Sequence, residues 1–228
     1  MRPNDFSPGR ILPHLQVVHD ADAHSAAMNM AVDEALLQTA RRPILRFYRW
    51  RRPSLSFGYF GLFAEVAAEE LERELVRRWT GGGIVLHGAD LTYSIILPRG
   101  LASELATPQA AYREIHGAIQ TALAGRVDVV LADEAAPKIS SACFANAVAA
   151  DVLLGDRKIA GAAQRRTRAG LLHQGSVQHS GLPSSFPTDF AAALCQDFEI
   201  MRLAPDLLQL AEKLAENKYA TSEWLHQR

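Results

Sequence analysis

The sequence is poor in cysteine and has no long apolar run. Its two cysteines, Cys143 and Cys195, stand far apart and show no metal-ligand spacing. This argues against a disulfide framework and favours a reducing compartment, the cytoplasm. No apolar run approaches the ~20 residues that a membrane span needs, and the first residues lack the apolar stretch of a signal peptide.

The chain also lacks an excess of charge of either sign. It carries 24 Lys and Arg against 25 Asp and Glu, for a formal net charge of −1 at pH 7. Such a balance argues against binding to nucleic acid or another polyanion as the main task. With 48% hydrophobic and 21% charged residues in 228, the composition is that of an ordinary globular protein.

Cap, turn and periodicity signals divide the chain into helices and strands. One helix is predicted from Ser25, its cap, to Ala40, and another opens at Thr107-Pro108. A shorter helix is expected over Glu65–Glu74, and residues 189–228 are predicted to be helical with Asp206 as a cap. Strands are expected at 44–50, 54–59, 76–79, 84–87, 91–97, 151–154, 157–160 and 171–177.

These strands come in hairpin-like groups. One pair flanks Gly88-Ala89-Asp90, and another flanks the two-residue turn Gly155-Asp156. Strict alternation of strand and helix is missing. The pattern therefore favours an α+β fold, with a mixed, largely antiparallel sheet and flanking helices, over a doubly wound fold.

Three successive glycines, Gly81 to Gly83, follow an extended basic segment, Arg77-Arg78. Without Cβ atoms the chain can take positive φ and approach a ligand closely, with its N–H groups aimed at an oxygen. In a strand, one arginine would face the site and the other solvent. The spacing matches neither a nucleotide P-loop nor a dinucleotide fingerprint. A simple hairpin turn is the alternative.

Lys158 and Cys143 are the candidate reactive side chains. Lys158 precedes a strand of small residues, Ile159–Ala163, against which a ligand could lie, and its cation could stabilise an oxyanion. A nearby ammonium would lower the pKa of the Cys143 thiol, and a thiolate can accept and pass on an acyl group. The alternatives are a solvated surface lysine and an inert, buried cysteine.

Several segments resemble the biotin/lipoate A/B protein ligase family, which holds lipoate–protein ligases and octanoyltransferases. They are Asn29–Leu37, Leu45–Trp50, Ser54–Tyr59, Arg77–His87 and Lys158–Gln164. The resemblance implies a class II biotin/lipoyl synthetase-like catalytic domain. It divides the chain into an N-terminal arm and first strand (1–24), an acyl-binding catalytic domain (25–200) and a C-terminal helical tail (201–228) without a full ligase accessory domain.

The same resemblance implies a set of site residues and no metal ligand. Cys143 and Lys158 would be catalytic. The residues implied to bind substrate are Arg78, Thr80, Gly81, Gly82, Gly83, His87, Gly161, Ala163, Gln164, Gly175 and Ser176. His173-Gln174 departs from the Gln-His order typical of the transferases, so His173 is given no role.

Three functional hypotheses follow. Cys143-Phe144 and Leu91–Ser94 resemble the cysteine-dependent transferases, which would pass an octanoyl or lipoyl group to the lysine of a lipoyl carrier domain without a cofactor. Gly83 instead resembles the ligases, which use ATP and Mg to form lipoyl-AMP, with or without a separate accessory subunit. A non-catalytic relative that only binds a lipoyl domain or fatty acid is the third.

Both enzymes are expected to act on lipoyl-domain proteins, namely 2-oxoacid dehydrogenase subunits and the glycine cleavage H protein. For the transferase, acyl carrier protein is a candidate donor. Neither nucleic acid nor a membrane is expected as a partner.

Overall fold

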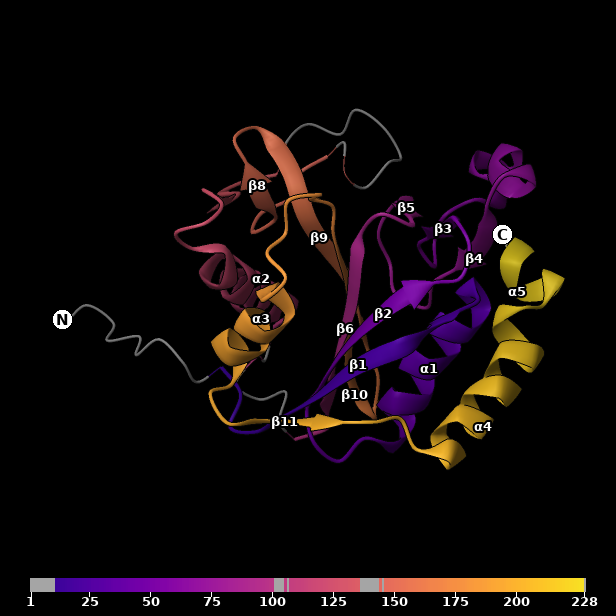
Figure 1. Cartoon of the computed structure of the whole chain (residues 1–228). Coiled ribbons are helices and arrows are strands. Elements are labelled where there is room, and N and C mark those ends of the chain that lie inside the picture. The colour runs from indigo at the N-terminus through magenta and orange to yellow at the C-terminus, as the bar shows by residue number, and fades with distance from the viewer. Residues whose placement is uncertain (1–10, 101–104, 106, 136–143, 145, 228) are drawn as a thin grey trace.

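An eight-stranded sheet with helices on both faces forms the centre of the molecule (Figure 1). The computed structural model describes residues 11–100, 105, 107–135, 144 and 146–227. The strand order is β11-β1-β2-β6-β10-β9-β8-β7. The strands are β1 (Leu15–His24), β2 (Ile44–Trp50), β6 (Leu91–Pro98), β7 (Val130–Leu131), β8 (Val152–Leu154), β9 (Arg157–Arg166), β10 (Gly170–Val177) and β11 (Phe198–Met201).

The pairing in this sheet is mixed. β1 runs parallel to both β2 and β11, while the pairs from β2 across to β7 are antiparallel. The turn Gly155-Asp156 joins β8 to β9 as the predicted hairpin. The predicted α+β class, with a mixed and largely antiparallel sheet, is confirmed.

A second, three-stranded sheet carries the glycine triplet. Its order is β4 (Glu74–Arg77), β3 (Ser54–Phe57) and β5 (Val85–His87), and the triplet lies in the loop between β4 and β5. The predicted hairpin around Gly88–Asp90 is wrong, because β5 pairs with β3 whereas β6 lies between β2 and β10. The turn therefore connects the two sheets.

Helices cover both faces of the large sheet (Figure 1). α1 (Ala26–Thr39) and α4 (Pro205–Leu214) lie on one face, and α2 (Pro108–Leu123) and α3 (Phe186–Leu194) on the other. Neighbouring residues of β6 enter opposite cores, Ile96 beneath α1 and Ile95 beneath α2, and both are fully buried. This is the period of two expected of a strand covered on both faces.

Two predicted helix starts are confirmed by their caps. The hydroxyl of Ser25 accepts a hydrogen bond from the Met28 N–H at 3.2 Å. The hydroxyl of Thr107 accepts one from the Ala110 N–H at 3.0 Å, with Pro108 in the first turn of α2. Both satisfy N–H groups that a helix start leaves open.

Two predicted helical segments are wrong in part. Glu65–Glu74 forms two short 3₁₀ turns, η1 (Phe63–Glu65) and η2 (Ala67–Leu71), and β4 begins at Glu74. Val66 is buried there but its neighbours are not, so the segment has no continuous apolar stripe to hold an α-helix against a core.

The C-terminal residues also contain more than helix. β11 adds a strand to the edge of the sheet before α4, the π-helical turn η4 (Ala215–Tyr219) and α5 (Ser222–His226). Asp206 lies in the first turn of α4 and does not cap it, since the cap position is Ala204. Within the described residues, no helix is both long and apolar enough to cross a membrane.

Candidate functional site

A broad groove separates the glycine loop from the first turns of α2. Its volume of about 1380 Å³ exceeds the ~300–1,000 Å³ typical of a small-molecule site. Several predicted site residues line it: Gly81, Gly82, Gly83, Lys158, Ala163 and Gln164. Exposed apolar side chains stand on its walls, with Phe60 67% and Leu62 50% accessible.

Lys158 lies in the wall of this groove, on β9, and is buried. Its Nζ is 2.8 Å from Asp151 Oδ2, and the two side chains are only 3% and 0% exposed. Nζ also lies 5.3 Å from the centre of the Phe144 ring. The reading of Lys158 as a solvated surface charge is therefore wrong.

Gly161 leaves the space in which the Lys158 side chain lies. A Cβ at Gly161 would stand 2.3 Å from Lys158 Cε and 2.7 Å from Nζ. Residue 161 must therefore be glycine for the ammonium to reach Asp151 in this conformation. The small-residue strand after Lys158 thus makes room for the side chain of Lys158 itself.

Asp151 and Tyr112 complete the surroundings of Lys158, and sequence reasoning gave neither a role. The Tyr112 hydroxyl donates to Asp151 Oδ1 and accepts from the Ala162 N–H at 3.0 Å. Asp151 was visible only as the first residue of a predicted strand, and Tyr112 only as an aromatic residue near the start of a helix. No motif joins them, because they meet through the packing of α2 on β8 and β9.

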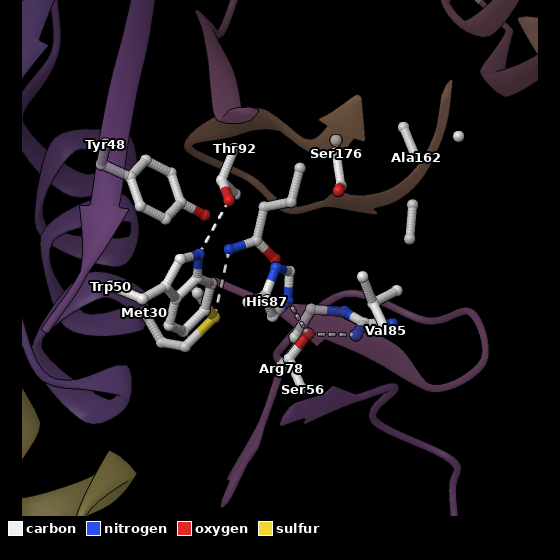
Figure 2. A pocket seen from close by; sticks show the side chains of 14 residues that line it. Met30, Tyr48, Trp50, Ser56, Arg78, Val85, His87, Thr92, Ala162 and Ser176 are labelled. Atoms are coloured by element: carbon white, nitrogen blue, oxygen red, sulfur yellow. Dashed lines mark hydrogen bonds between the residues drawn. The ribbon is translucent and has the colours of Figure 1, made fainter. Parts of the chain in front are cut away.

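A second, smaller cavity lies next to the groove, and Figure 2 shows the side chains that line it. Its volume of about 30 Å³ is roughly that of one water molecule. The residues around it come from both sheets and from α1: Met30, Tyr48, Trp50, Ser56, Arg78, Val85, His87, Thr92, Gly161, Ala162, Ala163, Gln174, Gly175 and Ser176. Ala162 and Ala163 line both this inner cavity and the outer groove.

Arg78 fixes the glycine loop through hydrogen bonds to two of its carbonyl groups. Its Nη2 donates to the carbonyl oxygens of Gly81 and Gly83 at 2.9 and 2.8 Å, and its Nη1 donates to Ser56 Oγ at 2.7 Å. Gly82 has φ of 86°, which confirms the predicted positive φ within the triplet. The hydrogen bonds from Arg78 and the positive φ of Gly82 therefore both contribute to the conformation of the loop.

Arg77 does not face solvent, so the expected division of the two arginines is wrong. Its guanidinium is fully buried and donates to the carbonyls of Tyr59, Gly61, Trp224 and Leu225. Strand alternation does send the two side chains to opposite faces. The second face is closed by the C-terminal helix α5, which the sequence pattern did not place there.

Thr80 lies behind the loop and is completely buried. Its hydroxyl donates to Gln174 Oε1 at 2.8 Å, and Gln174 Nε2 donates to Asp33 Oδ2 at 2.8 Å. This chain of hydrogen bonds ties the loop to β10 and α1. Gly175 lets the ring of Tyr93 pass, since a Cβ there would be 2.2 Å from the ring.

His87 links Arg78 to the turn between the sheets. Its Nε2 is 2.7 Å from Ser56 Oγ and its Nδ1 is 2.8 Å from Asp90 Oδ2, which also accepts from Ser176 Oγ at 2.7 Å. Burial lowers the pKa of His87, although the nearby Asp90 carboxylate acts to raise it. Burial acts to raise the pKa of Asp90, but its interactions with His87 and Ser176 outweigh burial and lower it.

The distances from Ser56 through His87 to Asp90 are those of a hydrolase triad. However, Ser56 is fully buried and its oxygen accepts from Arg78. The inner cavity beside it has a volume of only about 30 Å³, which suits water but not an acyl substrate. We therefore interpret the three side chains as the support that orients Arg78.

Cys143 and His173 are the two residues from the sequence analysis not yet described. Cys143 lies outside the residues that the structure describes, so the distance from its sulfur to Lys158 Nζ is not defined. His173 lies in a buried cluster, with its Nε2 3.3 Å from the Tyr93 hydroxyl and its Nδ1 3.2 Å from Gln164 Nε2. In the described part of the chain, no group of three His, Cys, Asp or Glu side chains could hold a metal ion.

Comparisons with known proteins identify the family and the fold. Residues 25–190 match the family model of the lipoyl protein ligase A/B catalytic domain. Octanoyltransferase LipM of Brevibacillus brevis is 30% identical over 89% of this chain and 95% of its own length. LipM of Oceanobacillus iheyensis is 39% identical over 67% of this chain and 59% of its own length.

Among solved structures, protein Ta0514 of T. acidophilum with bound lipoic acid superposes with a TM-score of 0.75. It is 21% identical in sequence, and the match covers 95% of this chain and 99% of that protein. At this identity, the similarity establishes a shared fold.

Proposed function

We propose that this chain, which belongs to the lipoyl protein ligase A/B catalytic domain family, transfers an octanoyl or lipoyl group to a lysine of a lipoyl-domain protein. The acyl group passes through a thioester on Cys143. The observation that carries the proposal is the buried Lys158 ammonium in the groove wall, beside the ring of Phe144. Phe144 follows Cys143 directly in the sequence.

The reaction proceeds in two balanced steps. The Cys143 thiolate attacks the carbonyl carbon of the donor thioester, a new C–S bond forms, and the donor leaves as a thiol after taking up a proton. The amine of the target lysine then attacks the acyl-cysteine, an amide forms, and the Cys143 thiol is released. Because the donor is already a thioester, neither step consumes ATP.

Lys158 serves as the fixed positive charge in both steps. An ammonium in a water-poor site stabilises the oxyanion that develops on the thioester carbonyl. It also favours the thiolate form of a neighbouring cysteine. The glycine loop, whose carbonyls are held by Arg78, forms the opposite wall and supports the acyl group.

The groove is large enough for more than an acyl chain. Its width and its exposed apolar side chains suit the arm of an acyl carrier protein and the lysine-bearing turn of a lipoyl domain. Lipoyl domains of 2-oxoacid dehydrogenases and of the glycine cleavage H protein are the acceptors that we propose. The cytoplasm suits this chemistry because it keeps thiols reduced.

Mass spectrometry of the intact protein tests the proposal directly. Incubation with octanoyl-acyl carrier protein is expected to add one octanoyl group, which hydroxylamine removes. Cys143→Ala is expected to abolish the adduct, whereas Cys195→Ala, which changes a buried cysteine elsewhere, retains it. An adduct that survives Cys143→Ala would show that another residue is acylated.

An ATP-dependent lipoate ligase remains the second candidate, favoured by Gly83 in the glycine loop. In that reaction Arg78, the loop and Lys158 would hold lipoyl-AMP, and Cys143 would be structural. Lipoate-dependent exchange between ATP and pyrophosphate, measured with Mg, distinguishes the two. The ligase predicts exchange that Cys143→Ala leaves intact, and the transferase predicts none.

A further inference from the structure

We infer that Asp151 and Tyr112 are positioning residues, which hold the Lys158 ammonium at one point of the groove wall for acyl transfer. The inference rests on the proposed function, in which Lys158 stabilises the reacting carbonyl. Neither residue belongs to a motif in the sequence.

Asp151 receives three hydrogen bonds, and each comes from a different part of the chain. Lys158 Nζ and the Val148 N–H donate to Oδ2 at 2.8 and 2.7 Å, and the Tyr112 hydroxyl donates to Oδ1. The carboxylate is fully buried. Its position is therefore set on both oxygens before any ligand enters the groove.

The backbone before Asp151 adopts a conformation that the turn enforces. Ala150 has φ of 67°, a left-handed conformation that is unfavourable for a residue with a Cβ. Hydrogen bonds hold it there: the Ala150 N–H donates to the Ala132 carbonyl at 2.7 Å, and the Asp151 N–H donates to the Val148 carbonyl at 3.0 Å. Such strain, kept in place by its surroundings, is typical of functional sites.

A buried ion pair is a poor way to stabilise a fold. Removing two charges from water costs several kcal/mol per ion, and apolar residues of similar size often stabilise a protein as well or better. Position 161 is a glycine, which leaves the space in which the Lys158 side chain lies. We therefore attribute the buried pair to the need for a positive charge in the groove wall and not to stability.

Tyr112 connects this ion pair to the strand that lines both cavities. Its hydroxyl donates to Asp151 and accepts from the Ala162 N–H, so one atom joins α2, β8 and β9. Its ring also lines the groove. A shift of Tyr112 would therefore move Lys158 and the Ala162 backbone together.

Other ionisable side chains of α2 lie near this ion pair. Burial lowers the pKa of His116 to about 4, so its ring is neutral near pH 7. Burial raises the pKa of Tyr112 well above its ordinary value, so its hydroxyl stays protonated. Arg113 also lines the groove and brings a positive charge to it.

The test compares Asp151→Asn, Asp151→Glu and Tyr112→Phe with the wild type in octanoyl transfer. We expect Asp151→Asn and Tyr112→Phe to lower kcat by about 10–100-fold, as loss of an orienting partner does elsewhere, with little change in KM for the donor. Asp151→Glu should recover activity relative to Asp151→Asn, because it restores the carboxylate. Asp156→Asn, an exposed acid in the same hairpin, is the matched control and should leave kcat unchanged.

Rescue by glutamate and the separation of kcat from KM distinguish positioning from a purely structural role. In folded Asp151→Asn the Lys158 ammonium loses the carboxylate that fixes its position, so kcat should fall while KM for the donor stays near the wild-type value. If Asp151→Asn does not fold, Tyr112→Phe and Asp151→Glu carry the test. Wild-type kcat in folded Asp151→Asn or Tyr112→Phe would overturn the inference. Failure of the wild type to form an octanoyl adduct would instead refute the proposed function.

Discussion

Replacing Gly161 with alanine should disable the site without unfolding the protein. The added Cβ would lie 2.3 Å from Lys158 Cε, whereas ordinary contact begins at 3.4 Å, so the side chain must move by about 1 Å. A misplacement of this size in a catalytic group lowers a rate by about 10²-fold, or about 3 kcal/mol in activation free energy. Gly161 does not have positive φ, so the backbone accepts alanine.

The assay is kcat for octanoyl transfer, together with thermal unfolding. Gly117→Ala is the matched control: a Cβ there meets nothing within 4 Å, so in helix α2 it should stabilise by about 0.5–1 kcal/mol and leave kcat unchanged. The sharper comparison places Gly161→Ala in a Lys158→Ala background. There the clash with Lys158 is gone and only a contact of 3.2 Å with Asp151 Oδ1 remains, so the second substitution should have little further effect on the rate.

Two results would refute this reasoning. One is wild-type kcat in Gly161→Ala. The other is an equal loss of rate from Gly161→Ala whether or not Lys158 is present, since that loss could not come from displacement of the ammonium.

Three further predictions concern the surroundings of the site. Gly175→Ala should destabilise the fold by about 1–3 kcal/mol or more in urea denaturation, because its Cβ would lie 2.2 Å from the buried ring of Tyr93; unchanged stability would contradict this packing. Arg78→Lys should raise KM for the acyl donor by about tenfold, since lysine cannot hold Ser56 and both loop carbonyls together; a normal KM would show that the loop keeps its shape unaided. His116 has a pKa of about 4 in the folded protein, below its usual 6.5. The unfolded chain therefore takes up the proton first as the pH falls, so the contribution to stability is complete above pH 6.5 and decreases toward pH 4, by about 3 kcal/mol in all. Unfolding free energies at pH 7.5 and 4.5 should show a weaker pH dependence in His116→Phe, and an identical dependence would exclude this role.

Local patterns in the sequence were sufficient for much of the fold. The caps at Ser25 and Thr107 were read correctly, because a cap depends on residues within one turn of the helix. The Gly155-Asp156 hairpin was also correct, since a two-residue turn sets the pairing of its own strands. The turn at Gly88–Asp90 was misread because its strands pair with distant partners instead of with each other.

Buried charges were the main failure of sequence reasoning. One of Arg77 and Arg78 was expected to face solvent, but the Arg77 guanidinium is enclosed by carbonyls from α5 and from the loop after β3. Sequence patterns do not predict burial of a lysine or arginine when its partners are carbonyl oxygens far along the chain. For the same reason they did not predict that the C-terminal segment would contact Arg77.

The sequence by itself indicated the family and singled out the glycine triplet and Lys158, which the structure brings to one groove. Only the tertiary structure decided that Lys158 is buried, that Asp151 and Tyr112 hold it, and that Gly161 makes room for it. The physical reason is distance. A glycine run or a cap depends on neighbouring residues, whereas an ion pair inside a protein forms only where separate elements pack together and exclude water.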